Sequence, residues 1–149
     1  MTAPEIIALL PYKSPFLFVD AIETISGNAV KGHYTFKETE YFYEGHFKNQ
    51  PVTPGVILTE CMAQIGLVCL GIYLFKDENL ENQNILVALT SHQIDFYLPV
   101  LPKEKITVIS EKEYFRFNKL KCRVKMLNEQ NELVCKGSIS GMIKSQGYD

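Results

Sequence analysis

Residues 56–75, VILTECMAQIGLVCLGIYLF, form the longest apolar run of the chain and decide its fold. The run is long enough to cross a membrane, but it contains the charged residue Glu60. Charges inside membranes are rare, and the segments on both sides resemble strands of a globular domain. We therefore expect a helix that a sheet buries on nearly all sides, and no membrane span.

The segments around this helix have the composition of strands and turns. The order is a short helix, a hairpin, a loop, the long helix and then a series of strands, which predicts an α+β fold. A chain of 149 residues suits one domain, so we expect residues 1–149 to form a single unit. The expected elements are a helix at 4–10, strands at 16–25 and 29–36, a loop at 38–53, a polar loop at 77–84, strands at 85–97, 105–117, 120–127 and 132–143, and a hairpin turn at 128–131.

Composition limits the possible functions. The net charge of −2 argues against a nucleic-acid partner, but residues 103–149 hold ten of the fifteen Lys and Arg residues, which allows an acidic partner. The four cysteines lack CxxC spacing and are interpreted as reduced core residues of a cytoplasmic protein. Residues 1–10 lack the basic start of a secretory signal. No motif predicts a metal site or a cofactor.

The chemistry-bearing residues surround the start of the long helix. His46 lies in Gly-His-Phe at 45–47, and a Pro-Gly turn precedes the apolar run. If the helix begins at Gly55, the N–H groups of Gly55 and Val56 lack partners within the helix. Glu60 lies in the following turn. His46 and Glu60 can therefore form an acid/base pair beside an oxyanion site made by these N–H groups.

Each of these features has a structural explanation when it is taken alone. Most histidines in loops are surface or core residues, and Pro-Gly turns before helices are common. A glutamate near a helix start can simply face the macrodipole. Glu60 is the least easily explained, because a carboxylate among apolar neighbours is costly when it is buried without a partner.

The combination resembles a known family. Residues 44–66, EGHFKNQPVTPGVILTECMAQIG, are similar to the signature of the bacterial β-hydroxyacyl–acyl-carrier-protein dehydratases, which have the hot-dog fold. The opening LLPYKSPFLFVD at 9–20 and the closing CRVKMLNEQNELVCKGSISGMI at 122–143 also resemble that family.

This resemblance implies a long helix wrapped by an antiparallel sheet, in homodimers that often assemble into hexamers. The active site would lie at the dimer interface, with the histidine from one subunit and the acid from the other. The substrate would be a β-hydroxyacyl chain on acyl carrier protein, and the product the trans-2-enoyl thioester. No metal or other cofactor would take part.

The resemblance also assigns roles to residues of this chain. His46 would remove the C2 proton, and Glu60 would help the C3 hydroxyl leave as water. The remaining assignments are Gly55 and Val56 for the thioester carbonyl, Gln64 for orienting Glu60 or a water, and Phe47, Pro54 and Tyr97 for the substrate tunnel.

The chain departs from the family at several positions. Within residues 95–103, DFYLPVLPK, the residues Asp95, Tyr97 and Leu98 replace the family's basic residues, and Lys103 replaces its glycine. Tyr12 stands where histidine is usual. A basic stripe alternates with apolar residues along 119–126, so it is either a docking face for an acidic carrier or the solvated outer face of a sheet. We interpret His33 and His92 as structural, because no acidic residue is spaced with them. The stripe consists of Lys119, Lys121, Arg123 and Lys125.

Two other functions compete with the dehydratase. One is a hot-dog acyl thioesterase, although thioesterases generally lack this combination of motifs. The other is a non-catalytic hot-dog subunit that supports an active partner. An isomerising dehydratase fits less well, because that branch of the family usually has aspartate where this chain has Glu60.

Overall fold

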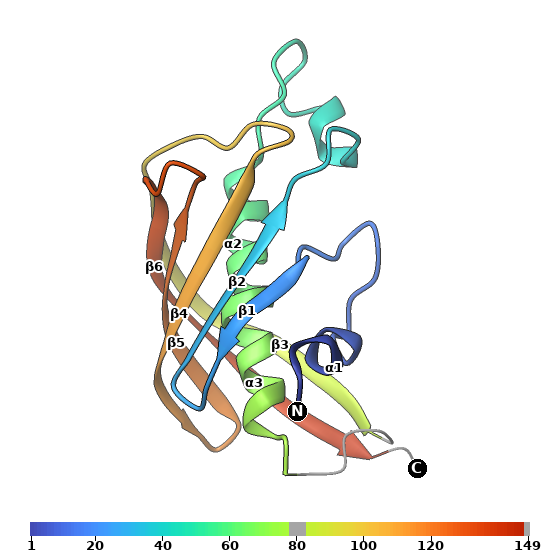
Figure 1. Ribbon diagram of the computed structural model, residues 1–149, viewed down its shortest axis with the longest axis vertical. Helices are drawn as coiled ribbons and strands as arrows, with labels where there is room; N and C mark the ends of the chain where they lie inside the picture. The colour runs from blue at the N-terminus through green and yellow to red at the C-terminus, as the bar shows by residue number, and fades with distance from the viewer. Residues whose placement is uncertain (78–82, 148–149) are drawn as a thin grey trace.

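The computed structural model describes residues 1–77 and 83–147 of the chain, and in it a central helix lies inside a curved antiparallel sheet (Figure 1). The elements are α1 (Ala3–Ala8), β1 (Ala21–Ile25), β2 (Ala29–Thr35), a 3₁₀ helix (Tyr41–Glu44), α2 (Gly55–Ala63), a π-helical segment (Gln64–Val68), α3 (Cys69–Leu74), β3 (Gln83–Phe96), β4 (Lys105–Arg116), β5 (Lys119–Leu127) and β6 (Leu133–Gly147).

Among the described residues, the sheet contains six strands in the order β1-β2-β4-β5-β6-β3, and all neighbouring strands are antiparallel. The edges are therefore β1 and β3. Strand β3 pairs with β6 from Gln83↔Gly147 to Phe96↔Cys135, so one long edge of the sheet has no neighbouring strand among the described residues. Such an edge presents unpaired backbone groups that a second chain can bind.

The central helix, which comprises α2, the π-helical segment and α3, is long and apolar enough to span a membrane. However, 83% of its most apolar window is buried inside the fold. The sheet supplies the covering surface by alternation, since Leu120, Cys122, Val124 and Met126 of β5 are buried while the residues between them are not. This confirms the prediction of a helix that is buried by a surrounding sheet.

The middle of the central helix is π-helical, which the sequence pattern did not predict. The Cys69 N–H donates to the Gln64 carbonyl, five residues earlier. The Ser110 hydroxyl of β4 donates to the Gly66 carbonyl at 2.8 Å, which ties this segment to the sheet. Single π-helical turns inside α-helices occur frequently at functional sites.

The predicted strand at 16–25 is wrong in its first half, because β1 begins only at Ala21. The backbone groups before it bind a side chain instead of a neighbouring strand. Gln64 Oε1 accepts the Phe18 N–H at 2.7 Å, and Gln64 Nε2 donates to the Phe16 carbonyl at 3.2 Å. The segment therefore packs on the helix as a loop.

The other expected strands are confirmed, with boundaries that differ by at most four residues. Within the loop predicted at 77–84, residues 78–82 lie outside the described residues. Residues 83 and 84 already belong to β3. The predicted turn at 128–131 is present, with the Asn128 N–H donating to the Glu132 carbonyl at 3.0 Å.

Candidate active site

His46 lies in the loop between the 3₁₀ helix and α2, and a hydrogen bond fixes its ring. The distance between His46 Nδ1 and the Val52 carbonyl oxygen is 2.9 Å. A carbonyl oxygen only accepts, so Nδ1 carries the proton and Nε2 keeps its lone pair. The Val52 N–H donates back to the His46 carbonyl at 2.9 Å, which closes the loop. The imidazole is therefore set up to act as a base through Nε2.

The central helix begins at Gly55, as the Pro-Gly turn predicted. Its first hydrogen bonds are donated by Ile57 and Leu58 to the Pro54 carbonyl, at 2.9 and 3.1 Å. The N–H groups of Gly55 and Val56 come before these bonds, at the positive end of the helix dipole. Val56 is 76% exposed, so a ligand can reach this end of the helix.

A cleft of about 350 Å³ opens beside this helix start. Phe96 forms part of its wall: a β-carbon added to Gly55 would lie 3.2 Å from the tip of the Phe96 ring, which makes the absence of a side chain at residue 55 important here. The sequence predicted Tyr97 at the site but missed Phe96. The lining residues are Thr53, Gly55, Leu58 and Phe96 to Pro99.

Glu60 is half-buried one turn further along the helix. Burial raises the pKa of its carboxyl group, and a hydrogen bond from Gln64 acts in the opposite direction. The fully buried Gln64 is already held by the backbone of Phe16 and Phe18, which leaves its second amide hydrogen for the carboxylate. A raised pKa keeps Glu60 protonated to higher pH, so it can donate a proton.

Tyr12 is a further neighbour of Glu60 that sequence reasoning did not assign to the site. Burial raises the pKa of its phenol, and repulsion from the Glu60 carboxylate, when that group is ionised, raises it further. One feature of the sequence pointed to this residue: Tyr12 stands where the family usually has histidine.

The structure does not bring all the predicted site residues together within one chain. In the part of the chain that the structure describes, no hydrogen bond or ion pair joins His46 to Glu60. Phe47 stacks on the His46 ring with centroids 3.9 Å apart and is 58% exposed. Pro54 caps the helix, and Tyr97 lines the cleft. The described residues 1–77 and 83–147 contain no cluster of three or more His, Cys, Asp or Glu placed to hold a metal ion.

The expectation that His33 has no acidic neighbour is wrong. A register shift in β1 between Ile22 and Thr24 accommodates Glu23, whose carboxylate lies 3.3 Å from His33 Nδ1. Spacing along the sequence could not show this contact, because the two residues belong to different strands. His33 and Glu23 form a partly exposed pair on the outer face of the sheet.

The basic stripe of β5 faces outwards, as its alternation predicted, but part of it is neutralised. Arg123 lies 3.1 Å from Glu111 and 3.7 Å from Glu113, both on β4. Lys121 lies 3.6 Å from Glu113. Two of the four basic side chains are therefore already paired with carboxylates of the same sheet.

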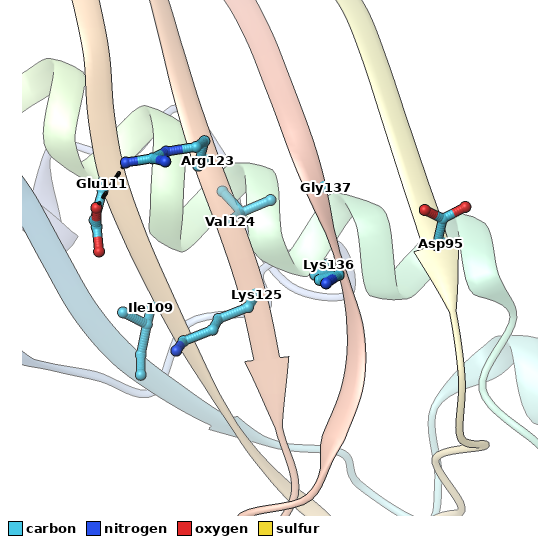
Figure 2. Close-up of a pocket in the computed structure, with 8 residues that line it drawn as sticks. All are labelled: Asp95, Ile109, Glu111, Arg123, Val124, Lys125, Lys136 and Gly137. Atoms are coloured by element: carbon cyan, nitrogen blue, oxygen red, sulfur yellow. Dashed lines mark hydrogen bonds and ion pairs between the residues drawn. The ribbon is translucent and has the colours of Figure 1, made fainter.

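An outer-face cleft of about 330 Å³ lies beside the Arg123–Glu111 pair. Figure 2 shows the residues that line it. Lys125 of β5 stands directly opposite Lys136 of β6, and Asp95 of β3 follows in the same cross-strand row. Within the described residues, neither lysine forms an ion pair. Like charges directly opposite each other destabilise a sheet, so an anionic partner would relieve this contact.

Residues 10–135 match the family of FabA-like domains, and the chain belongs to this family. Curated relatives are named 3-hydroxyacyl-acyl-carrier-protein dehydratase FabZ. The protein from Nitratidesulfovibrio vulgaris is 36% identical over 104 residues, which are 68% of this chain and 65% of that protein. The match thus spans just under two thirds of this relative. The protein from Ehrlichia canis is 32% identical over 147 residues, covering 94% of this chain and 93% of that protein.

Solved structures confirm the hot-dog fold. The dehydratase heterocomplex ApeI:P from Xenorhabdus doucetiae has a TM-score of 0.76 and 11% identity, and the match covers 100% of this chain and 93% of that chain. A thioesterase from Haemophilus influenzae has a TM-score of 0.67 and 14% identity, with 97% and 91% covered. At these identities the likeness concerns the fold alone. The curated sequence relatives are named as dehydratases, so they favour the dehydratase over the thioesterase alternative.

Proposed function

We propose that this protein removes water from a β-hydroxyacyl thioester on acyl carrier protein and forms the trans-2-enoyl thioester. The observation that supports this most directly is the hydrogen bond between His46 Nδ1 and the Val52 carbonyl, three residues before a helix start whose first N–H groups have no partner in the helix. Family membership and the FabZ relatives point to the same reaction. The reaction is a carbon–oxygen lyase step that needs no cofactor.

The proposed mechanism uses each group once. His46 Nε2 takes the C2 proton, and the electrons of that bond form the C2–C3 double bond. Negative charge develops on the thioester oxygen, where the Gly55 and Val56 N–H groups stabilise it by roughly 3 kcal/mol per well-placed donor. The C3–O bond breaks, and the protonated Glu60 gives its proton to the leaving hydroxyl, which departs as water. Gln64 then holds the resulting carboxylate.

We propose a homodimer as the active unit, because no hydrogen bond or ion pair joins His46 to Glu60 among the described residues of one chain. The long unpaired edge of β3 offers a surface for a second copy, and Leu86 and Leu89 on this strand are 40% and 43% exposed. In that arrangement His46 of one subunit faces Glu60 of the other. Assembly of such dimers into hexamers is part of the same proposal.

Purified protein supplied with a β-hydroxyacyl carrier substrate should produce the 2-enoyl thioester. His46→Ala should lower kcat/KM by about 10²- to 10⁴-fold, the usual contribution of a general base. Intact-mass analysis of the carrier distinguishes the alternatives, because a thioesterase would release the free acid and a non-catalytic subunit would leave the substrate unchanged. Activity that survives in both His46→Ala and Glu60→Gln would refute the assignment.

The dimer proposal has its own test by complementation. Subunits carrying His46→Ala are exchanged with subunits carrying Glu60→Gln, so that mixed dimers contain one intact site. Random exchange should restore roughly a quarter of the wild-type activity, as two-fold symmetry requires. No recovery, with subunit exchange confirmed by mass spectrometry, would place both residues in the same subunit's site.

For the carrier protein, we propose that its acidic surface contacts Lys125 and Lys136 more than the paired Lys121 and Arg123. Charge complementarity is the supporting observation, because the latter pair already has carboxylate partners. Lys125→Glu with Lys136→Glu should raise KM for the carrier substrate and weaken its salt dependence. The matched double variant, Lys121→Glu with Arg123→Glu, should change KM less. Equal effects would contradict this choice of contacts.

We place the protein in the cytoplasm as part of the same proposal. All four cysteines are buried and free, which suits a reducing compartment. The cysteine side chains pack in the core, where burial raises their pKa, so they serve as small apolar residues.

A further inference from the structure

The loop that carries His46 begins at a buried carboxylate that the proposed chemistry does not use. Glu40 is only 8% exposed. Its Oε2 atom accepts the Tyr34 hydroxyl at 2.5 Å and the Lys37 N–H at 3.2 Å. Tyr34 lies in β2 and is almost completely buried, so this contact fixes the start of the loop to the sheet. A buried carboxylate is costly without such donors.

A second buried contact fixes the end of the loop. The Tyr43 hydroxyl lies 2.6 Å from Thr53 Oγ1, and the Thr53 N–H donates to the Val100 carbonyl at 2.8 Å. Thr53 comes two residues before Gly55, where the central helix begins. The Tyr43 N–H also donates to the Glu40 carbonyl at 3.2 Å, so the 3₁₀ helix connects the two contacts.

Both tyrosines remain protonated at neutral pH, which keeps these hydrogen bonds intact. Burial raises the pKa of Tyr34, and the hydrogen bond to Glu40 raises it further. Burial raises the pKa of Tyr43 to about 12, although the hydrogen bond with Thr53 acts in the opposite direction. Tyr34 therefore acts as the donor to the Glu40 carboxylate.

His46 depends on these contacts through Val52, which binds the imidazole and is followed directly by Thr53. The Val52 carbonyl that fixes Nδ1 precedes Thr53, so a shift of Thr53 moves the acceptor that sets the imidazole tautomer. The same shift moves the ring relative to Gly55. A displacement of about 1 Å in a catalytic group can cost about 100-fold in rate.

We propose that Glu40 and Tyr43 are positioning residues for His46, which hold its imidazole in the tautomer and place that proton abstraction requires. This inference rests on the proposed role of His46 as the base. Each residue acts through the loop between residues 40 and 53.

Tyr43→Phe, Thr53→Val and the double variant test the second contact, because each removes one side of a single hydrogen bond. We expect kcat to fall about 10- to 100-fold with KM changed less than about twofold. The double variant should be no slower than the slower single variant, since both remove the same interaction. Tyr41→Phe is the matched control, on the same 3₁₀ helix but 51% exposed, and should leave kcat unchanged.

The Glu40 contact is tested by rescue with a conservative variant. Glu40→Gln keeps an oxygen that can accept the Tyr34 hydroxyl and should retain most of the wild-type kcat. Glu40→Ala leaves the buried hydroxyl without an acceptor and should lower kcat at least as much as Tyr43→Phe. Equal kcat for Glu40→Ala and the wild type would overturn the inference for this residue.

Nitrogen-15 NMR of the His46 ring gives a readout that does not depend on activity. The wild type should show the tautomer with the proton on Nδ1, and Tyr43→Phe should show a mixture of tautomers. An inactive wild type with these resonances would refute the proposed function but not the positioning contacts. Unchanged His46 resonances in Tyr43→Phe would overturn the positioning role, whether or not kcat falls.

Discussion

The two ends of the central helix differ in what surrounds them. At the N-terminal end, Val56 is exposed, Glu60 is half-buried and Gly55 lies under the edge of the half-exposed Phe96. At the C-terminal end, residues Cys69 to Ile72 are buried, and Gly71 faces the side chain of Ile143. Among the described residues, the first end exposes polar groups and backbone N–H donors that have no partner within the helix. At the second end, the side chains of Cys69 to Ile72 are packed in the core.

This difference separates chemistry from stability along one continuous helix. Burial of apolar side chains supplies about 25 cal/mol for each Å² removed from water, so the buried side chains of Cys69 to Ile72 at the C-terminal end serve folding. The N-terminal end gives up part of that contribution, because a substrate must reach its donors and its carboxyl group. Substitutions at the two ends should therefore affect different properties.

Gln64, which joins the two ends, should show the largest effect on stability. Gln64→Leu removes the hydrogen bonds to Phe18 N–H and the Phe16 carbonyl, and it leaves the Phe18 N–H buried without a partner while the Phe16 carbonyl is only partly buried. At about 1–3 kcal/mol for the buried N–H group and less for the partly buried carbonyl, the free energy of unfolding should fall by roughly 2–4 kcal/mol. Urea denaturation measures this change.

The matched control is Gln130→Leu, since Gln130 is an exposed glutamine in the turn between β5 and β6. Its free energy of unfolding should stay within about 0.5 kcal/mol of the wild type. A Gln64→Leu variant as stable as this control would show that the loop before β1 is held by packing alone.

Gln64 also illustrates how far the sequence predicts this molecule. The central helix and the strands follow from local patterns of apolar residues, and His46, Gly55 and Glu60 follow from a short motif. The anchoring of Phe18 by Gln64 joins residues 46 positions apart, so no local pattern contains it. The π-helical segment and the Phe96 wall of the cleft are likewise results of packing between distant segments.

Substitutions of two glycines of the central helix, Gly71 and Gly55, should separate stability from activity. A β-carbon at residue 71 would lie 2.6 Å from the Ile143 Cδ1 atom, so Gly71→Ala overpacks the core. We expect a loss of about 1–3 kcal/mol in stability with kcat retained in the folded protein. Thermal or urea denaturation and the dehydratase assay measure the two effects.

Gly55→Ala should behave in the opposite way. The nearest atoms to the added methyl group belong to the half-exposed Phe96 ring, the first at 3.2 Å, and this ring can turn towards solvent, so stability should change by less than about 1 kcal/mol. The methyl group would stand beside the proposed oxyanion donors, and kcat/KM should fall about tenfold or more. If Gly55→Ala lost stability and Gly71→Ala lost activity, the division between the two ends would be wrong.

The smallest effect concerns the pH dependence of stability at Glu60. Burial raises the pKa of this carboxyl group in the folded protein, so the folded state binds the proton more tightly than the unfolded state. Wild-type stability should therefore decrease as pH rises from the ordinary carboxyl value of about 4.3 through the raised pKa. Glu60→Gln has no proton to lose at this position, so its stability relative to the wild type should increase over that interval and stay constant above it. Melting temperatures of both proteins across this range measure the difference, and a relative stability that falls as pH rises would mean that ionised Glu60 stabilises the N-terminal end.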